Sequence, residues 1–449
     1  MRTESADVLV LGAGVAGLAA AEVLCDAGLH VLLLEARERI GGRIYTVRSS
    51  ETELPVELGA EFIHGRPREI WELVHRADLP AREVQGERWY VEGGKLSPAG
   101  EVLSAVDEIF ERLDPSAPDQ SFQEFLDRNC ADCPQRAKER AAAFVSGFHA
   151  ADPARIGVHS LIAGMQADEQ IEGSRGFRIV GGYDRLVAHM LAAIDPQRLT
   201  LCLRTVVKMV EWERGAVQMV AESATGQSSF SAPRAIITLP LGVLKASSYE
   251  GAVQFAPALP AEPLAKLEMG SAVRVGLLFR QRFWEDEAIA ARAGKSLANM
   301  SFVFSEDHWF STWWTTMPTG SPLLTGWAGG TRAKKLALTG EEVMVGRALE
   351  SLGSIFGLER STLQGLLEGH YVHDWDADPF SRGAYSYAAV GGAGAPRILS
   401  QPLKNTLFLA GEATEFTGHS GTVHGAIASG RRAAHQVLAA VRVPQRRRA

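Results

Sequence analysis

The sequence lacks the features that mark several large classes of protein. Its 449 residues carry 46 basic and 53 acidic side chains, a net charge of -7. Without a basic excess to attract a phosphate backbone, we expect no nucleic acid partner. The basic tail at 445–449 is expected to be a solvated, disordered end. The four cysteines indicate a reducing compartment, and since no secretory signal fits the first residues, we expect a cytoplasmic protein.

Signals for a metal site or a membrane span are also scarce. Cys130 and Cys133 form a C-x-x-C pair, but no second pair or nearby histidine completes a zinc site. We therefore expect no metal and interpret the pair as ordinary surface thiols, with a redox or metal role as the weaker alternative. The apolar run at 8–24 is interrupted by three glycines, which favours a strand, a turn and a helix over a membrane span.

What the sequence does contain begins with a β-α-β unit. Apolar strands are predicted at 6–11 and 29–35, with a helix at 15–27 between them. Both strands are apolar throughout, as a parallel sheet buried on both faces requires. The unit therefore predicts one edge of a doubly wound nucleotide-binding domain.

A glycine motif lies at the turn of this unit. Gly12, Gly14 and Gly17 form G-x-G-x-x-G, and Glu35 closes the following strand. The glycines allow a tight turn, a close approach to a pyrophosphate and close helix packing, and the carboxylate accepts hydrogen bonds from a ribose. The arrangement favours nucleotide binding over an incidental glycine-rich turn.

The rest of the chain alternates between helical and strand-like segments. Residues 100–200 are mostly helical in pattern, 205–240 alternate as strands do, and 250–395 mix both, before a last strand and helix. We predict an α/β protein: a Rossmann-like dinucleotide-binding domain built from discontinuous segments, with a second α+β domain whose mixed sheet is flanked by helices. The expected segments are 1–90, 205–250 and 396–449 for the first domain, and 91–204 and 251–395 for the second, substrate-binding domain.

A second glycine-rich stretch follows Glu35 directly, in ARERIGGR at 36–43. Its Gly41 and Gly42 free more backbone, and Arg37 and Arg43 can neutralise a pyrophosphate. In this stretch the sequence resembles the flavin amine oxidase family, which includes monoamine oxidases, polyamine oxidases and lysine-specific histone demethylases. It looks most similar to bacterial polyamine oxidase-like members.

The resemblance extends along most of the chain and implies FAD, bound in a domain of the GR2 type. It is carried by ELGAEFIHG at 57–65, LPLGVLK at 239–245, WDADPFSRGAYSYAAVGG at 375–392 and LFLAGEATEFTGHSGTVHGAIASG at 407–430. In the last motif Glu412 is expected to accept bonds from a ribityl or ribose hydroxyl. Thr422 and Val423 open a helix whose amides can stabilise negative charge on a reduced flavin; a glycine-terminated strand and a capped helix is the alternative. Val207 completes the set of residues expected to contact FAD.

The substrate side rests on the same resemblance. Ala384 stands where monoamine oxidases carry the cysteine that bonds to the flavin, so FAD is expected to be non-covalent. Tyr385 matches an aromatic that flanks the amine, or is a core aromatic. His64 matches a histidine near the substrate of several polyamine oxidases, or is a structural histidine. Glu61 is expected either to attract a cationic amine or to lie exposed.

Arg274 is the least expected residue of the site. It lies in the apolar stretch GSAVRVGLLF, where the family usually has a lysine joined through a water to flavin N5. Arginine keeps the positive charge but cannot act as a base, which leaves oxidase and dehydrogenase activity both open. Among Trp309, Trp313, Trp314 and Trp327, one or two are expected to reach the substrate.

These residues predict an FAD-dependent amine oxidase. A small-molecule amine, secondary or polyamine-like, is expected to lose hydride from its α-carbon to flavin N5, with O2 as electron acceptor and hydrogen peroxide as product. The alternatives are an amino-acid oxidase or C–C desaturase on the same fold, and a non-catalytic FAD-binding scaffold. The sequence does not indicate the oligomeric state.

Overall fold

Five short parallel strands form the central sheet of the computed structural model, which describes residues 2–48, 53–224, 226–247 and 250–442. The order is β11-β3-β2-β15-β24, and each neighbouring pair runs parallel. The bounds are β2 (Val8–Leu11), β3 (Val31–Leu34), β11 (Leu199–Cys202), β15 (Ala235–Ile237) and β24 (Leu407–Leu409). Every residue of β2, β3, β15 and β24 is buried, which explains their uninterrupted apolar sequence.

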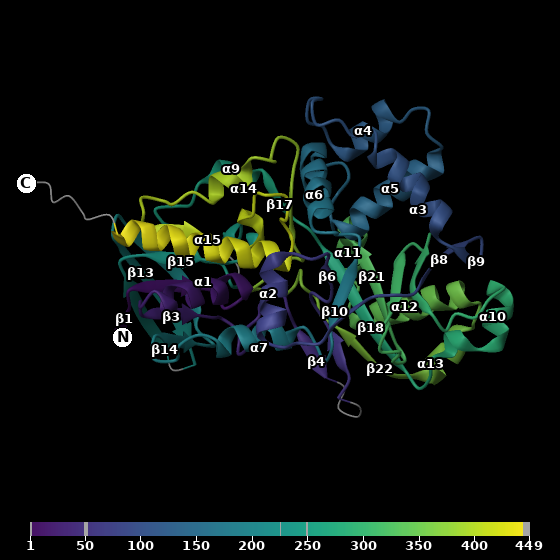
Figure 1. Cartoon of the computed structure of the whole chain (residues 1–449), viewed down its shortest axis with the longest axis horizontal. Helices are drawn as coiled ribbons and strands as arrows, with labels where there is room; N and C mark the ends of the chain where they lie inside the picture. Colours follow the sequence, from purple (N-terminus) through teal and green to yellow (C-terminus); the bar gives the residue numbers. More distant parts are fainter. Residues whose placement is uncertain (1, 49–52, 225, 248–249, 443–449) are drawn as a thin grey trace, which may run out of the picture.

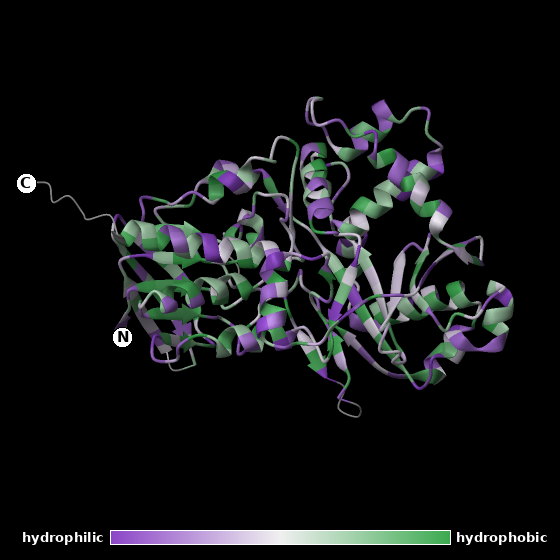
Figure 2. Ribbon diagram, in the orientation of Figure 1, coloured by the Kyte–Doolittle hydropathy of each residue, from purple (hydrophilic) through white to green (hydrophobic). Residues whose placement is uncertain are grey.

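Helices cover one face of this sheet and a second sheet covers the other. Helices α1 (Val15–Asp26) and α15 (Val423–Arg442) come from opposite ends of the chain and pack side by side (Figure 1). The second sheet has the order β1-β14-β13-β12-β16. Its bounds are β1 (Arg2–Ser5), β12 (Val206–Glu213), β13 (Ala216–Ser223), β14 (Gly226–Ala232) and β16 (Gln254–Ala256). The buried α1 and the central strands are strongly hydrophobic in Figure 2.

A mixed seven-stranded sheet forms the other half of the molecule (Figure 1). The order is β22-β18-β21-β20-β19-β8-β9, and within it β8 and β19 run parallel while the other pairs are antiparallel. The bounds are β8 (Glu87–Glu92), β9 (Lys95–Pro98), β18 (Ala272–Phe279), β19 (Met300–Ser305), β20 (Thr312–Thr315), β21 (Leu323–Gly329) and β22 (Leu367–Val372). Around it lie α10 (Glu287–Ala293), α11 (Gly330–Ala337), α12 (Glu341–Phe356) and α13 (Arg360–Leu366).

A helical group lies over one end of this sheet (Figure 1). It comprises α3 (Gly100–Phe110), α4 (Phe122–Asn129), α5 (Gln135–Phe148) and α6 (Val158–Gln170), close to the predicted helical region. Ser121 and Glu124 form a reciprocal capping box at the start of α4, which explains why that helix begins there. The four helices share a core of their own.

Short elements connect these parts. The sheet β6-β10-β7 joins β6 (Ile63–His64), β7 (Ala81–Glu83) and β10 (Gly176–Ile179). The other strands are β4 (Thr46–Arg48), β5 (Pro55–Glu57), β17 (Leu267–Met269) and β23 (Ser386–Ala388). The other helices are α2 (Arg68–Arg76), α7 (Asp184–Ala192), α8 (Leu241–Leu244), α9 (Ala261–Ala265), η1 (Phe283–Glu285), α14 (Ala395–Leu399) and η2 (Glu412–Thr414).

The predicted elements compare closely with the observed ones. The strands at 6–11 and 29–35 and the helix at 15–27 appear as β2, β3 and α1. Two segments cross the expected domain boundaries: β11 belongs to the central parallel sheet, and β8 begins at Glu87 in the seven-stranded sheet. The domain division itself stays a prediction. Among the described residues no helix is both long and apolar enough to cross a membrane; the basic tail at 445–449 lies outside them.

Candidate functional site

The first glycine motif forms the sharp turn between β2 and α1. Gly12 has φ +105°, and a Cβ on Gly17 would stand 1.9 Å from the Gly12 carbonyl oxygen. Only glycine permits that conformation and that approach without strain. The buried Glu35 carboxylate accepts the amides of Ala13 and Arg37, both at 2.9 Å, so it also holds the turn in place.

The second glycine stretch lies directly against the first. Gly14 and Gly41 form a β-bridge, and the Gly41 amide donates to the Ala13 carbonyl oxygen at 2.9 Å. A Cβ on Gly42 would stand 3.4 Å from the Gly14 Cα. The two stretches thus bring Gly14, Gly41 and Gly42 together without side chains between them, which fits a bound pyrophosphate.

Arg37 and Arg43 of the second stretch have carboxylate partners that the sequence did not reveal. Arg37 donates to Asp378 at 2.7 Å, and Arg43 donates to Glu412 at 2.8 Å and to the Ala384 carbonyl oxygen at 2.7 Å. Burial alone would raise the pKa of Asp378, but hydrogen bonds from His373 and Arg37 outweigh it and hold that pKa well below its usual range. The two arginines therefore join distant segments, and their contact with a pyrophosphate stays a prediction.

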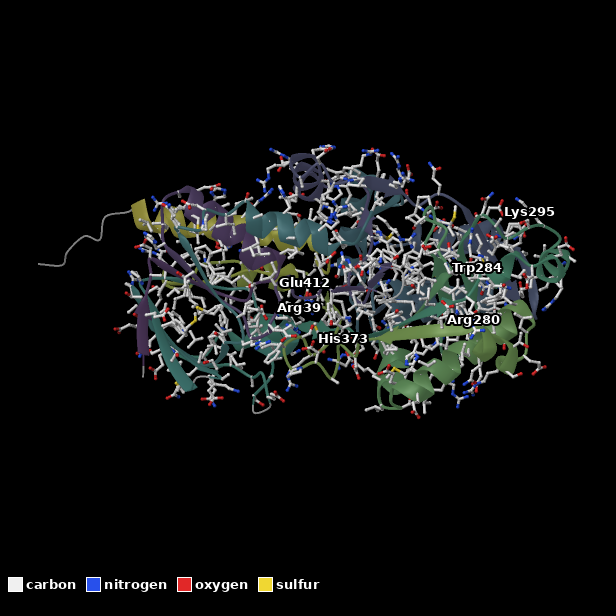
Figure 3. All side chains as sticks on the ribbon, turned by 90° about the horizontal axis from the view of Figure 1, so that it is seen from below. Arg39, Arg280, Trp284, Lys295, His373 and Glu412 are labelled. Carbon is white, nitrogen blue, oxygen red and sulfur yellow. The ribbon has the colours of Figure 1, made fainter. Side chains whose placement is uncertain are left out.

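The C-terminal motif at 407–430 contacts the second glycine stretch through Glu412, which binds Arg43. Glu412 also accepts from the Ser386 hydroxyl at 2.6 Å and the Gly421 amide at 3.1 Å. Thr422 caps α15, which begins at Val423, by accepting the Gly425 amide at 3.0 Å. Figure 3 shows Glu412 in the middle of the molecule, near Arg39 and His373 in that view.

A cavity of about 340 Å³ lies beside the β3 end of this arrangement. Its lining includes Ala36, which follows Glu35, together with Val206, Lys208 and Phe380. Val207, which follows Val206 in β12, is buried. Both chain neighbours of Val207, Val206 and Lys208, therefore line the cavity.

An aromatic cluster extends from Ala384 to the seven-stranded sheet. We use that name for Phe62, His64, Phe148, Trp314, Trp327 and Tyr385. The Tyr385 hydroxyl donates to the Phe148 carbonyl oxygen at 2.6 Å, and the His64 and Phe148 rings lie 5.6 Å apart. Trp314 lies 5.6 Å from Phe62 and 6.2 Å from Trp327, while Trp327 and Tyr385 pack around Ala384.

Two of the four candidate tryptophans therefore belong to this cluster. Trp313 is fully buried in the core of the seven-stranded sheet and donates to Ser351, and Trp309 packs against the same core. Phe62 and Phe148 were not singled out from the sequence, since isolated phenylalanines on a strand end and a helix resemble ordinary core residues.

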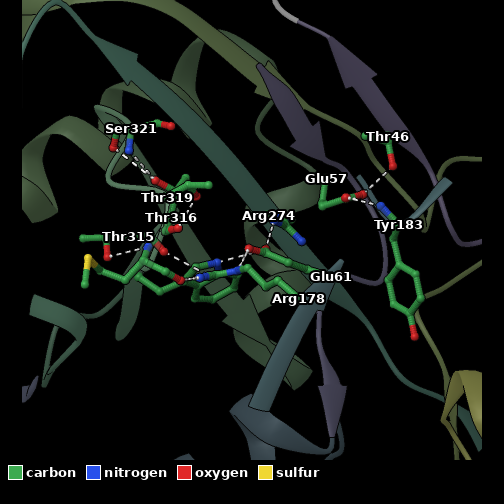
Figure 4. Close-up of polar contacts among 12 residues, drawn as sticks. Thr46, Glu57, Glu61, Arg178, Tyr183, Arg274, Thr315, Thr316, Thr319 and Ser321 are labelled. Carbon is green, nitrogen blue, oxygen red and sulfur yellow. Dashed lines mark hydrogen bonds and ion pairs between the residues drawn. The ribbon is translucent and has the colours of Figure 1, made fainter. Parts of the chain in front are cut away.

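Arg274 lies on β18 and is 4% exposed. Its guanidinium forms an ion pair with Glu61 and donates to the Gly59 carbonyl oxygen at 2.9 Å (Figure 4). Glu61 also accepts from Arg178 at 2.7 Å and from the Trp314 indole at 3.0 Å. Arg274 is thus a buried, paired charge next to the aromatic cluster, and Glu61 is not exposed.

The ionisable groups here have pKa values that favour neutral imidazoles and an ionised Glu61. Burial alone would raise the pKa of Glu61, but Arg274 and Arg178 outweigh it and lower the pKa. Burial lowers the pKa of His64, and burial with the charges of His419 and His64 lowers the pKa of His424 to about 3. His424 is buried within 4.7 Å of the His419 ring, at the start of α15.

The cysteine pair differs from its expected position. Cys130 is fully buried, so the expectation of two surface thiols is wrong for it. Burial and a hydrogen bond with Cys133 raise the Cys130 pKa to about 11, so the thiol stays protonated. Across the described ranges, no cluster of three or more His, Cys, Asp or Glu residues could hold a metal ion.

Comparisons with known proteins agree with this arrangement. The model of a family described as flavin-containing amine oxidoreductase matches residues 15–129 and 94–438. The chain is 30% identical over 462 residues to lysine-specific histone demethylase 1 homolog 2 of Arabidopsis thaliana, covering 96% of this chain and 58% of that protein. It is 29% identical to probable polyamine oxidase 4 of the same plant, covering 94% and 85%. The chain thus spans about three fifths of that demethylase homologue.

Solved structures show the same fold. Putrescine oxidase bound to putrescine superimposes with a TM-score of 0.79 at 20% identity, covering 98% of this chain and all of that one. Cyclohexylamine oxidase from Brevibacterium oxydans IH-35A has a TM-score of 0.77 at 21% identity. The expected α/β fold class and the FAD cofactor are confirmed. The chain belongs to the flavin-containing amine oxidoreductase family.

Proposed function

We propose that the protein oxidises a small-molecule amine with non-covalently bound FAD. One observation carries the proposal: Arg43, from the second glycine stretch, bonds both Glu412 of the C-terminal motif and the Ala384 carbonyl oxygen. Three segments far apart in sequence thereby meet at the edge of the aromatic cluster. Ala384 at this junction has no nucleophilic side chain with which to attach a flavin.

The residues that would hold FAD line this junction. The glycine stretches would bind the pyrophosphate through backbone amides, Glu35 and Val207 would contact the adenosine end, and Glu412 and the start of α15 would contact the flavin end. The set comprises Gly12, Gly14, Gly17, Glu35, Arg37, Gly41, Gly42, Arg43, Val207, Glu412, Thr422 and Val423. Arg37 and Arg43 would act in it by holding the loops together.

The chain's own residues would orient the amine and exclude water. FAD, when bound, would supply the acceptor for the hydride that leaves the α-carbon, and O2 would then take up the electrons to give hydrogen peroxide. The Tyr385 ring, fixed by its hydroxyl bond to Phe148, would flank the amine, and the neutral His64 would contact it. Water hydrolyses the imine product. We also propose a cytoplasmic location, which the absence of disulfides among the four cysteines supports.

The test is anaerobic reduction of the purified yellow protein by a panel of primary, secondary and polyamine-like amines and amino acids. Bleaching by an amine, followed by peroxide release in air, supports the proposal. Bleaching by amino acids alone would favour the amino-acid oxidase, and bleaching by nothing in the panel would favour a non-catalytic FAD-binding protein. Acid precipitation should release the FAD, and flavin retained in the pellet would contradict non-covalent binding.

A further inference from the structure

The site contains an excess of buried positive charge. Arg274 and Arg178 both bind Glu61, and no second carboxylate hydrogen-bonds to either guanidinium among the described residues (Figure 4). The side chains of Arg178, Arg274 and Glu61 are 12%, 5% and 9% exposed. We call these three residues the arginine-pair unit. Two guanidinium groups and one carboxylate leave it with one net positive charge.

Backbone contacts hold the unit rigidly. Arg178 donates to the carbonyl oxygens of Met317 and, at 2.9 Å, Thr315, and its guanidinium lies over the Phe62 ring with the centroid at 4.6 Å. Arg274 is held by the Gly59 carbonyl oxygen at 2.9 Å. Neither arginine can swing away from a second cation that enters the site.

The surrounding groups do not cancel this charge. His64 is neutral because burial lowers its pKa. Glu57 is a further acid whose pKa responds to Glu61 and Arg274, but its oxygens accept from the Thr46 hydroxyl at 2.6 Å and the Tyr183 amide at 2.7 Å. Burial raises the pKa of Glu57 to about 7, so it carries only part of a charge at neutral pH.

The unit borders the aromatic cluster directly. Phe62, under Arg178, lies 6.1 Å from His64, and Trp314, bonded to Glu61, lies 6.2 Å from Trp327. A substrate chain packed on these rings would lie beside the excess charge. A second ammonium there would be repelled, whereas an apolar end would not.

We propose that Arg178 is a specificity-determining residue that makes this site prefer amines with one nitrogen over diamines and polyamines. The inference rests on the proposed function and narrows its substrate class. It separates this chain from any relative that would use a carboxylate to bind a second ammonium group.

The experiment compares hexylamine with 1,6-diaminohexane, which share a six-carbon chain and differ by one ammonium group. Anaerobic stopped-flow reduction at pH 7 gives the limiting rate of flavin reduction divided by Kd for each amine, which is taken as its kcat/KM, and the ratio of the two values cancels differences in flavin content. Wild type should favour hexylamine. Arg178→Met should raise the diamine's relative kcat/KM about tenfold, since one unit charge acting across a partly buried site contributes an energy of this order. Glu61→Gln should lower the diamine's relative kcat/KM by a similar factor, because loss of the carboxylate increases the net positive charge of the unit.

Two controls test whether charge at this position is the cause. Arg178→Lys keeps the charge and should keep the wild-type ratio. Arg175→Met removes a charge just before β10, where Arg175 pairs with Glu83 and Glu172 near the surface, and should also leave the ratio unchanged. The inference would be overturned if Arg175→Met changed the ratio of the two kcat/KM values as much as Arg178→Met does. It would also be overturned if Arg178→Lys changed the ratio in the same way as Arg178→Met.

The inference fails separately from the proposed function. A wild type that reduces its flavin with both amines equally, or prefers the diamine, overturns the inference and leaves amine oxidation intact. If no amine of the panel reduces the flavin, the proposed function fails. The shift of the oxidised flavin spectrum on titration with the same two amines then gives their Kd ratio, which should move in the variants in the same directions. An unmoved ratio, or binding of neither amine, overturns the inference.

Discussion

Arg274 carries a permanent charge into the interior of β18, and that charge requires a partner. A buried guanidinium without a carboxylate would cost several kcal/mol, and Glu61 supplies the carboxylate. The Arg274 Nε, in contrast, has no hydrogen-bond partner among the described residues. Lysine at this position would offer a more mobile point charge, whereas arginine is fixed by two partners.

The first residue-scale prediction follows from that difference. Arg274→Lys should accelerate oxidation of the reduced flavin by O2 severalfold, because it restores the lysine expected from the family resemblance. Stopped-flow mixing of photoreduced enzyme with oxygenated buffer measures the rate. Arg280→Lys is the control, since Arg280 is exposed just past the end of β18 and lies well away from Glu412 in Figure 3. An unchanged rate in Arg274→Lys would remove Arg274 from the mechanism.

The second prediction at this scale concerns Glu57. Burial raises the pKa of this carboxyl from 4.5 to about 7. A raised pKa means that the folded state holds the proton more tightly than the unfolded state. The stabilisation is therefore complete below about pH 4.5 and is lost as the pH rises through about 7, by about 3 kcal/mol at most. Glu57→Gln should remove most of this pH dependence and raise the Tm at pH 8. Thermal unfolding of wild type and Glu57→Gln at pH 5 and pH 8 tests this prediction. An equal fall in Tm between the two pH values in both proteins would contradict the assignment to Glu57.

At the scale of elements, the contact between α1 and α15 is set by glycine. A Cβ on Gly430 of α15 would stand 2.1 Å from the Ala16 carbonyl oxygen of α1. The helices therefore approach closely enough for their backbones to touch at Gly430, which a larger residue there would prevent.

Gly430→Ala should consequently force the two helices apart and destabilise the protein by about 1–3 kcal/mol. The matched control is Gly365→Ala in α13, where an added Cβ meets no atom within 4 Å. That change should be neutral or stabilise by up to about 1 kcal/mol, because alanine is the better helix former. Urea unfolding of the three proteins gives both values; equal stabilities for the two variants would show that the helices can separate at no cost.

At the scale of the whole molecule, FAD would connect segments that are distant in sequence. The two glycine stretches, the strand before Glu412 and the start of α15 meet around Arg43 and Ala384. A ligand that binds only the folded chain stabilises it by mass action. Removal of FAD should therefore lower the Tm, and FAD added back at about 100 times its Kd should restore roughly 2.7 kcal/mol. Circular dichroism melts of the holo, apo and reconstituted protein measure this, and a Tm independent of FAD would contradict the proposed binding residues.

The separate segments also show how much of the molecule could be predicted. The β2-α1-β3 unit, both glycine stretches, Glu412 and α15 were predicted because apolar periodicity and glycine spacing are local properties that a short stretch contains in full. The position of β11 in the central sheet was not predicted. Its four residues carry no distinctive apolar or glycine pattern, and its place depends on pairing with β3.

The sequence by itself determined the nucleotide-binding fold, the family and the unusual arginine at 274. Only the tertiary structure decided which opposite charges pair: Arg37 with Asp378, Arg43 with Glu412, and both Arg178 and Arg274 with Glu61. The physical reason is that an ion pair depends on distance in space, and these partners lie on strands and loops far apart in the chain. Arg178 on a short strand resembles any solvated arginine until β10 packs beside β6 and turns it toward Glu61.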